Sequence, residues 1–188
     1  MEGNKIIMKK VFIIHGFDGS PNGGWRPWLM SELDKKDVYC CALSMPAPKK
    51  PICSEWVDEI SRHVNKNQKD EICLVGHSLG VPAILRFLEI YKGTKKISRV
   101  VLVSGPIKKT DNKFVNKFLN KPFDFKKIKS KAKSFFIIHG DNDPLVPLSE
   151  AIELSKLLSA ELTIVKKGGH LNGSSGWHKL PRCLKAIL

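Results

Sequence analysis

The chain has 188 residues, 42% hydrophobic and 27% charged, which is typical of one globular domain over residues 1–188. This composition excludes disordered and fibrous classes, and no run of about 18 apolar residues could span a membrane. Lys and Arg number 32 against 18 Asp and Glu, and the net charge of +14 would suit an acidic partner or nucleic acid. No nucleic-acid-binding motif is present, so nucleic acid is not the expected partner.

The start of the chain does not fit a signal peptide, because only four apolar residues, 11–14, precede His15 and Gly16. Met8 is an alternative start, which would make residues 1–7 an appendage. The five cysteines form an odd set without a C-x-x-C pair, so they indicate neither a disulfide framework nor a zinc site. We therefore expect a reducing, cytoplasmic location.

Short apolar runs alternate with longer segments of helical periodicity along the whole chain. This alternation predicts the α/β class, with a six-stranded parallel sheet covered by helices on both faces. The expected strands are residues 10–14, 38–43, 72–75, 100–104, 135–138 and 162–165. The expected helices, one after each strand, are residues 25–35, 54–64, 79–91, 111–119, 149–158 and 177–188.

The pentapeptide FIIHG ends the first and the fifth of these strands, at residues 12–16 and 136–140. A glycine-rich loop follows the first copy and an acidic loop the second, and no other period exists, so an internal repeat is not indicated. In open parallel sheets, functional groups gather at the carboxyl ends of strands. The repeated pentapeptide therefore marks two loops of one site.

The strongest motif is GHSLG at residues 76–80, directly after an expected strand and before an expected helix. This is the pattern of a nucleophile elbow, a tight turn that needs glycine on both sides and lifts a serine hydroxyl above the sheet. The alternative is that the motif occurs by chance in a loop. The expected strand before it and the expected helix after it argue against this alternative. We identify Ser78 as the candidate nucleophile.

A serine nucleophile needs a base and an acid that orients this base. The loop GDNDPLVP supplies Asp143, and the GGH after the last strand supplies His170. Asp141 is a second carboxylate in the same loop, but only Asp143 fits the pattern G-x-x-D-x-x-V-P. The order Ser78, Asp143, His170 is that of α/β-hydrolases. The other histidines are interpreted as strand-end residues (His15, His139), the variable elbow position (His77) and helix-surface residues (His63, His178).

The oxyanion that forms when a serine attacks a carbonyl needs hydrogen-bond donors already aimed at it. The backbone N–H of Leu79, next to the nucleophile, is one candidate, and that of Phe17, in the loop after the first strand, is the other. We also expect substrate contacts from His15 and Trp25, which flank this loop.

Residues 108–133 contain ten Lys and two Asp and alone contribute a charge of +8. Asp111 could cap a helix in which Phe114 and Phe118 share one face, with a lysine stripe beside them. A solvated amphipathic helix is favoured over a binding surface, because charge runs are usually exposed faces. The stripe consists of Lys113, Lys117 and Lys121.

The chain resembles the small α/β-hydrolases typified by retinoblastoma-binding protein nine. The resemblance spans nearly all of it: the HG and glycine-rich loop, Gly24-Trp25, Met45-Pro46, GHSLG, the acidic loop and GGH. It implies a six-stranded sheet without a lid domain. The L-x-C-x-E motif of the human member is absent, so binding of a retinoblastoma-type protein is not implied.

The leading hypothesis is a serine hydrolase that cleaves small esters, thioesters or amides through an acyl-enzyme on Ser78. This hypothesis needs no metal or organic cofactor. Asp141-Asn142-Asp143 could be mistaken for a calcium loop, but it lacks the later glycine and the terminal glutamate of such a loop. The alternative is a non-catalytic interaction module that binds an acidic partner through its Lys-rich face. The physiological substrate and the oligomeric state are left open by the sequence.

Overall fold

The structure, a computed structural model, describes residues 7–188, and its centre is a six-stranded, entirely parallel sheet in the order β2-β1-β3-β4-β5-β6. The strands are β1 Lys9–Ile14, β2 Tyr39–Ala42, β3 Glu71–His77, β4 Ile97–Val103, β5 Ala132–Gly140 and β6 Glu161–Val165. The α-helices are α1 Arg26–Asp34, α2 Cys53–Lys66, α3 Gly80–Ile90, α4 Phe125–Ser130, α5 Leu148–Leu158 and α6 Pro181–Ile187.

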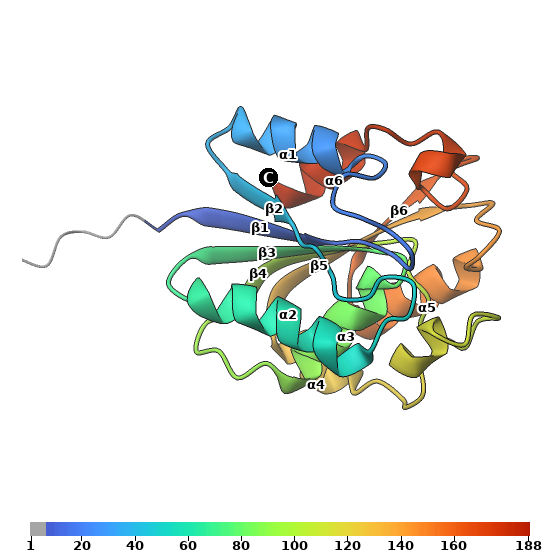
Figure 1. Ribbon diagram of the computed structural model, residues 1–188, viewed down its shortest axis with the longest axis horizontal. Coiled ribbons are helices and arrows are strands. Elements are labelled where there is room, and N and C mark those ends of the chain that lie inside the picture. Colours follow the sequence, from blue (N-terminus) through green and yellow to red (C-terminus); the bar gives the residue numbers. More distant parts are fainter. Residues whose placement is uncertain (1–6) are drawn as a thin grey trace, which may run out of the picture.

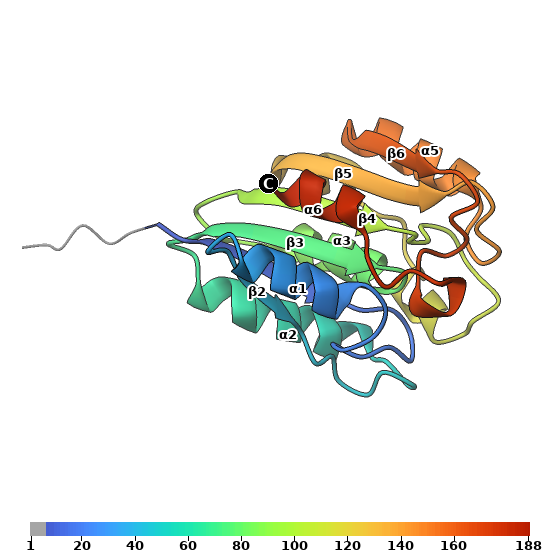
Figure 2. The same ribbon diagram turned by 90° about the horizontal axis from the view of Figure 1, so that it is seen from above.

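The helices cover the sheet in two layers. Figures 1 and 2 show α1 and α6 on one face and α2, α3, α4 and α5 on the other. Side chains of β1 alternate between the two layers, because successive residues of a strand point to opposite faces. Val11 and Ile13 pack with α1 and α6, whereas Phe12 and Ile14 pack with α2 and α3. The central strands are thus buried on both sides, as expected for a parallel sheet.

The carboxyl ends of all six strands point the same way, toward the right in Figure 1. The loops that follow β1, β3, β4, β5 and β6 meet at this edge of the sheet. The sequence-based expectation of a six-stranded parallel α/β fold is therefore confirmed, and the arrangement brings together loops from distant parts of the chain.

Two expected helices are wrong in part. Residues 111–119 do not form an α-helix but a single 3-10 turn, Val115–Phe118. The Asn112 side chain accepts hydrogen bonds from the N–H groups of Phe114 and Val115 and so competes with helical backbone bonding, and Asp111 does not cap the turn. The last helix begins at Pro181 rather than at residue 177, since a proline disfavours helical backbone at the residue before it.

Two elements were not expected from the sequence. Helix α4 is only six residues long and is capped by Asp124, whose side chain accepts from the Lys127 N–H. A 3-10 turn, Gly173–Ser175, follows the last strand. Both are too short to show a clear periodicity.

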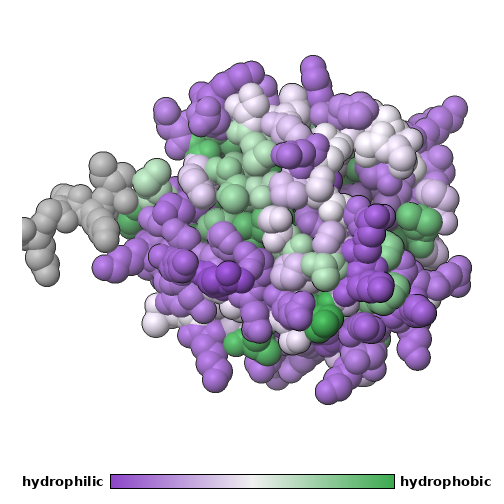
Figure 3. Space-filling view, viewed as in Figure 1, coloured by the Kyte–Doolittle hydropathy of each residue, from purple (hydrophilic) through white to green (hydrophobic). Residues whose placement is uncertain are grey.

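The outer surface is mostly polar on the face in Figure 3, where hydrophobic residues occur in small groups between hydrophilic ones. Within residues 7–188, no helix has the length and apolar character needed to cross a bilayer. Of residues 1–7, which the sequence analysis named as a possible appendage, residues 1–6 lie outside the described part of the chain. Ile7 is described, and its side chain is exposed.

Candidate active site

Ser78 lies in a sharp turn between β3 and α3. Its φ of +54° is in the left-handed region, which is strained for a residue with a side chain. The turn is tight because Gly80 packs against β1: a Cβ on Gly80 would lie 2.3 Å from the Ile14 carbonyl oxygen. A Cβ on Gly76 would lie 2.8 Å from the Gly80 backbone. The two glycines are thus needed where the sequence pattern places them.

Three side chains from three loops form a continuous hydrogen-bonded series. The Nε2 atom of His170 is 2.9 Å from Ser78 Oγ, and its Nδ1 atom lies 3.0 and 2.9 Å from the two carboxylate oxygens of Asp143. A carboxylate can only accept, so Nδ1 carries the proton and donates a hydrogen bond to Asp143. Nε2 is then free to accept the hydroxyl proton of Ser78.

The Asp143 carboxylate is held in one position. Its side chain has 0% exposed surface. Burial by itself raises the pKa of Asp143, but hydrogen bonds from His170 and from the N–H groups of Leu145 and Val146 outweigh this effect and hold the pKa below its usual value. Asp143 is therefore ionised at neutral pH.

Backbone N–H groups near Ser78 are available to bind an anion. Among residues 7–188, neither the Phe17 nor the Leu79 N–H donates a hydrogen bond to another group. Gly16 lets the Phe17 loop approach the serine, since a Cβ there would lie 2.9 Å from the Ser78 Cβ. The arrangement can stabilise negative charge on an oxygen next to Ser78.

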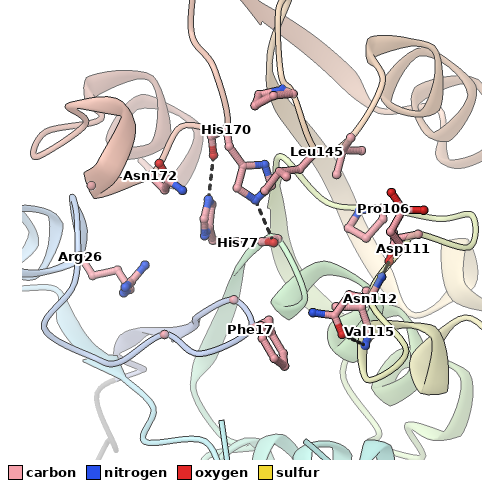
Figure 4. Close-up of a pocket in the computed structure, with 17 residues that line it drawn as sticks. Phe17, Arg26, His77, Pro106, Asp111, Asn112, Val115, Leu145, His170 and Asn172 are labelled. Carbon is pink, nitrogen blue, oxygen red and sulfur yellow. Dashed lines mark hydrogen bonds between the residues drawn. The ribbon is translucent and has the colours of Figure 1, made fainter. Parts of the chain in front are cut away.

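A cavity of about 410 Å³ opens above Ser78 (Figure 4). This volume is within the range of sites for small ligands. Loops after β1, β3, β4, β5 and β6 all contribute to its wall. The lining residues are Gly16, Phe17, Gly19, Arg26, His77, Ser78, Pro106, Thr110, Asp111, Asn112, Val115, Pro144, Leu145, Val146, His170, Asn172 and Gly173.

His15 and Trp25 do not line this cavity, which corrects the expectation that they contact substrate. His15 is 1% exposed, its Nδ1 atom lies 2.8 Å from the Gly16 carbonyl oxygen, and its ring packs on Trp56. Trp25 is fully buried, and its Nε1 donates to the Leu171 carbonyl. The Nδ1 atom of His15 and the Nε1 atom of Trp25 thus have partners within the protein, and both side chains support the loops from the interior.

His77, interpreted from the sequence only as the variable elbow position, supports the histidine of the series. Its Nε2 lies 3.0 Å from the His170 carbonyl oxygen (Figure 4), and the two rings are 5.1 Å apart. Burial lowers the pKa of His77 to about 3. The ring is therefore neutral, and its Nε2–H donates to the loop that carries His170.

The Lys-rich segment lies closer to the cavity than its sequence indicates. Phe114 stacks on Phe17 with ring centroids 6.0 Å apart, and the ammonium groups of Lys113 and Lys117 lie over the Phe114 ring at 5.5 and 5.3 Å. Residues 110–112 and Val115 of this segment line the cavity, because the loop preceding the 3-10 turn folds over the sheet edge. The three lysines of the stripe are nevertheless exposed.

The fold, the elbow and the hydrogen-bonded serine, histidine and aspartate define an α/β-hydrolase. A family model described as serine hydrolase matches residues 11–187, and the chain belongs to this family. The resemblance stated from the sequence is thereby confirmed.

Three known proteins illustrate the relationship. YdeN of Bacillus subtilis (strain 168) is 36% identical over 93% of this chain and 92% of its own. Its crystal structure has a TM-score of 0.90 over 96% of this chain and 97% of its own. The serine hydrolase RBBP9 of Rattus norvegicus is 26% identical, with 95% of each chain covered. Est1E of Butyrivibrio proteoclasticus, 17% identical with a TM-score of 0.75 over 98% of this chain and 87% of its own, shares the fold.

Proposed function

We propose that this hydrolase cleaves small esters, thioesters or amides through an acyl-enzyme on Ser78, with His170 as base and Asp143 as the acid that orients it. The observation that carries the proposal is the hydrogen-bonded series from Ser78 Oγ to the buried Asp143 carboxylate. Such a series supplies what a serine hydroxyl lacks at neutral pH, a proton acceptor in the correct tautomer.

The reaction begins when Ser78 Oγ attacks the substrate carbonyl carbon and its proton passes to His170 Nε2. The carbonyl oxygen becomes an oxyanion, which the N–H groups of Phe17 and Leu79 bind. The imidazolium stays paired with Asp143 and then gives its proton to the leaving oxygen, sulfur or nitrogen. Water then attacks the acyl carbon as the same histidine takes its proton, and the imidazolium returns this proton to Ser78 Oγ as the carboxylic acid leaves.

The shape of the cavity favours small-molecule acyl substrates. Its volume of about 410 Å³ holds a compact ligand. Apolar groups from Phe17, Val115 and Leu145 provide contacts for hydrocarbon, while Ser78 and His170 face the same space. We place no metal or organic cofactor in this mechanism, because each proton transfer has a named side chain.

Labelling with a fluorophosphonate tests the proposal. We expect intact-mass spectrometry to show one adduct on the wild-type protein and none on Ser78→Ala, and p-nitrophenyl butyrate hydrolysis by this variant to fall by about 10³-fold or more. Ser149→Ala, which alters an exposed serine on α5, is the matched control and should label like the wild type. Equal labelling of all three proteins would contradict the proposal and favour the non-catalytic interaction module.

A further inference from the structure

Arg26 is a buried cation in the wall of the cavity. It is the first residue of α1, only 6% of its surface is exposed, and it lines the same cavity as Ser78. Its Nε donates to the Ser20 carbonyl at 2.9 Å. Among residues 7–188, its two terminal nitrogens have no hydrogen-bond partner and no carboxylate pairs with it.

Arg26 is more buried than the other arginines, yet its guanidinium contacts only the Trp25 ring, at 6.0 Å, and the Ser20 carbonyl among residues 7–188. Arg62 and Arg86, which are more exposed, form ion pairs with Glu59 and Glu89. Burial lowers the pKa of Arg26 to about 10, so it still carries its charge at neutral pH. A buried charge without a counter-charge is costly to keep, and buried charges in proteins are normally paired, so an anionic ligand would supply the pair that Arg26 lacks.

The residues around the guanidinium leave room for its terminal nitrogens beside the cavity. Gly23 provides the space, since a Cβ there would lie 2.4 Å from Arg26 Nη2. Figure 4 shows the side chain extending into the cavity beneath Asn172 and His77, on the opposite side from Asp111. His77 is neutral, and no carboxylate of residues 7–188 forms an ion pair with Arg26.

We propose that Arg26 binds a carboxylate of the substrate, and hence that the preferred substrates are esters, thioesters or amides that carry a second, anionic carboxylate group. The two terminal nitrogens match the two oxygens of a carboxylate, which neutral acyl groups lack. The proposal rests on the hydrolytic function given above and narrows its substrate class. A role limited to fixing the loop through Ser20 would require only Nε and would not select for substrate charge.

Paired substrates of nearly equal shape test the charge preference in the wild-type protein. The acyl-side pair is the mono-4-nitrophenyl ester of adipic acid and the 4-nitrophenyl ester of adipamic acid. The alcohol-side pair is 4-acetoxybenzoate and 4-acetoxybenzamide. We expect kcat/KM to favour the anionic member of at least one pair by about tenfold or more, the scale of a charge-assisted hydrogen bond. A ratio near one in both pairs would overturn the proposal.

Variants assign the preference to Arg26. The ratios are compared at high salt, which screens the contribution of the exposed lysines. In Arg26→Gln the anionic-to-neutral ratio should then fall to near one, and in Arg26→Lys it should be partly retained, because the charge remains without the fork geometry. Arg182→Gln, which removes an exposed arginine on α6, is the matched control and should keep the wild-type ratio. An unchanged ratio in a folded Arg26→Gln protein would refute the assignment.

A binding measurement separates this proposal from the hydrolytic one. Calorimetry with adipate and adipamide compares the charged and neutral ligands without turnover. Tighter binding of adipate that Arg26→Lys weakens supports the carboxylate site even if no ester is hydrolysed, a result that would contradict only the hydrolytic proposal. Equal binding of the two ligands, with neutral esters still hydrolysed, would overturn the carboxylate site alone. Thermal melting of each variant shows whether it is folded.

Discussion

Two carboxylates lie two residues apart in the loop after β5, and their side chains have different partners. Asp143 is buried against His170, whereas Asp141 is exposed and accepts a hydrogen bond from the Lys167 N–H at 2.7 Å. The proposed acid must hold one histidine tautomer and balance the imidazolium charge. Asp141 has neither contact, so it can affect catalysis only through the shape of the loop.

The variants Asp143→Asn and Asp141→Asn should therefore differ strongly. We expect Asp143→Asn to lower kcat by about 10³- to 10⁴-fold, because an amide favours the wrong tautomer of His170. Its melting temperature should change little, since the amide oxygen can still accept from the N–H groups of Leu145 and Val146. Asp141→Asn should lower kcat by about tenfold or less. If Asp141→Asn lowered kcat more than Asp143→Asn, the assignment of Asp143 as the acid would be wrong.

The three residues of the hydrogen-bonded series could be predicted from the sequence because each follows a strand in a recognisable local pattern. Arg26 could not, since nothing in its sequence neighbourhood shows that the α1 amino terminus is buried beside Ser78. The same holds for residues 110–112, which reach the cavity only because the loop after β4 folds over the sheet edge. Cavity walls depend on loop packing, which local periodicity does not record.

At the scale of elements, strand positions were predictable and helix ends less so. All six strands overlap the expected ranges, because buried parallel strands are continuous apolar runs. The expected helix at residues 111–119 failed where side chains compete with the helical backbone: Asn112 caps two N–H groups, and the Asn116 side chain bonds to Thr110. Apolar spacing alone does not reveal such local hydrogen bonds.

The contact between α3 and β1 at the elbow gives a prediction about stability. In Gly80→Ala the added methyl would meet backbone, the Ile14 carbonyl, which cannot rotate away as a side chain can. We expect the free energy of unfolding to fall by about 1–3 kcal/mol or more, as for other overpacked cores, with fluorophosphonate labelling also reduced because Ser78 shifts. Urea denaturation measures the first effect. Wild-type stability together with wild-type labelling would show that the elbow is looser than the contact distances indicate.

At the scale of the whole molecule, the chain has a net charge of +14, and the cavity wall contains an arginine without an ion pair among residues 7–188. The lysines of the stripe are exposed, and two of them lie over the Phe114 ring that stacks on Phe17. Exposed charges act at a distance mainly by raising the local concentration of oppositely charged ligands. Salt screens this attraction, which at 0.1 M ionic strength decays over a distance of about 10 Å. Their influence should thus depend on substrate charge and on ionic strength.

Replacing Lys113, Lys117 and Lys121 together with glutamine tests this expectation. For a neutral ester such as p-nitrophenyl butyrate, we expect kcat/KM to change by less than about threefold at any salt concentration, since no lysine of the stripe lines the cavity. For an anionic ester, kcat/KM should fall several-fold at low salt and recover to the wild-type value at high salt, because screening removes the advantage that the lysines gave. A loss of tenfold or more on the neutral ester at every salt concentration would instead mean that the stripe holds the Phe114–Phe17 stack in place, and with it the proposed oxyanion donor, the Phe17 N–H.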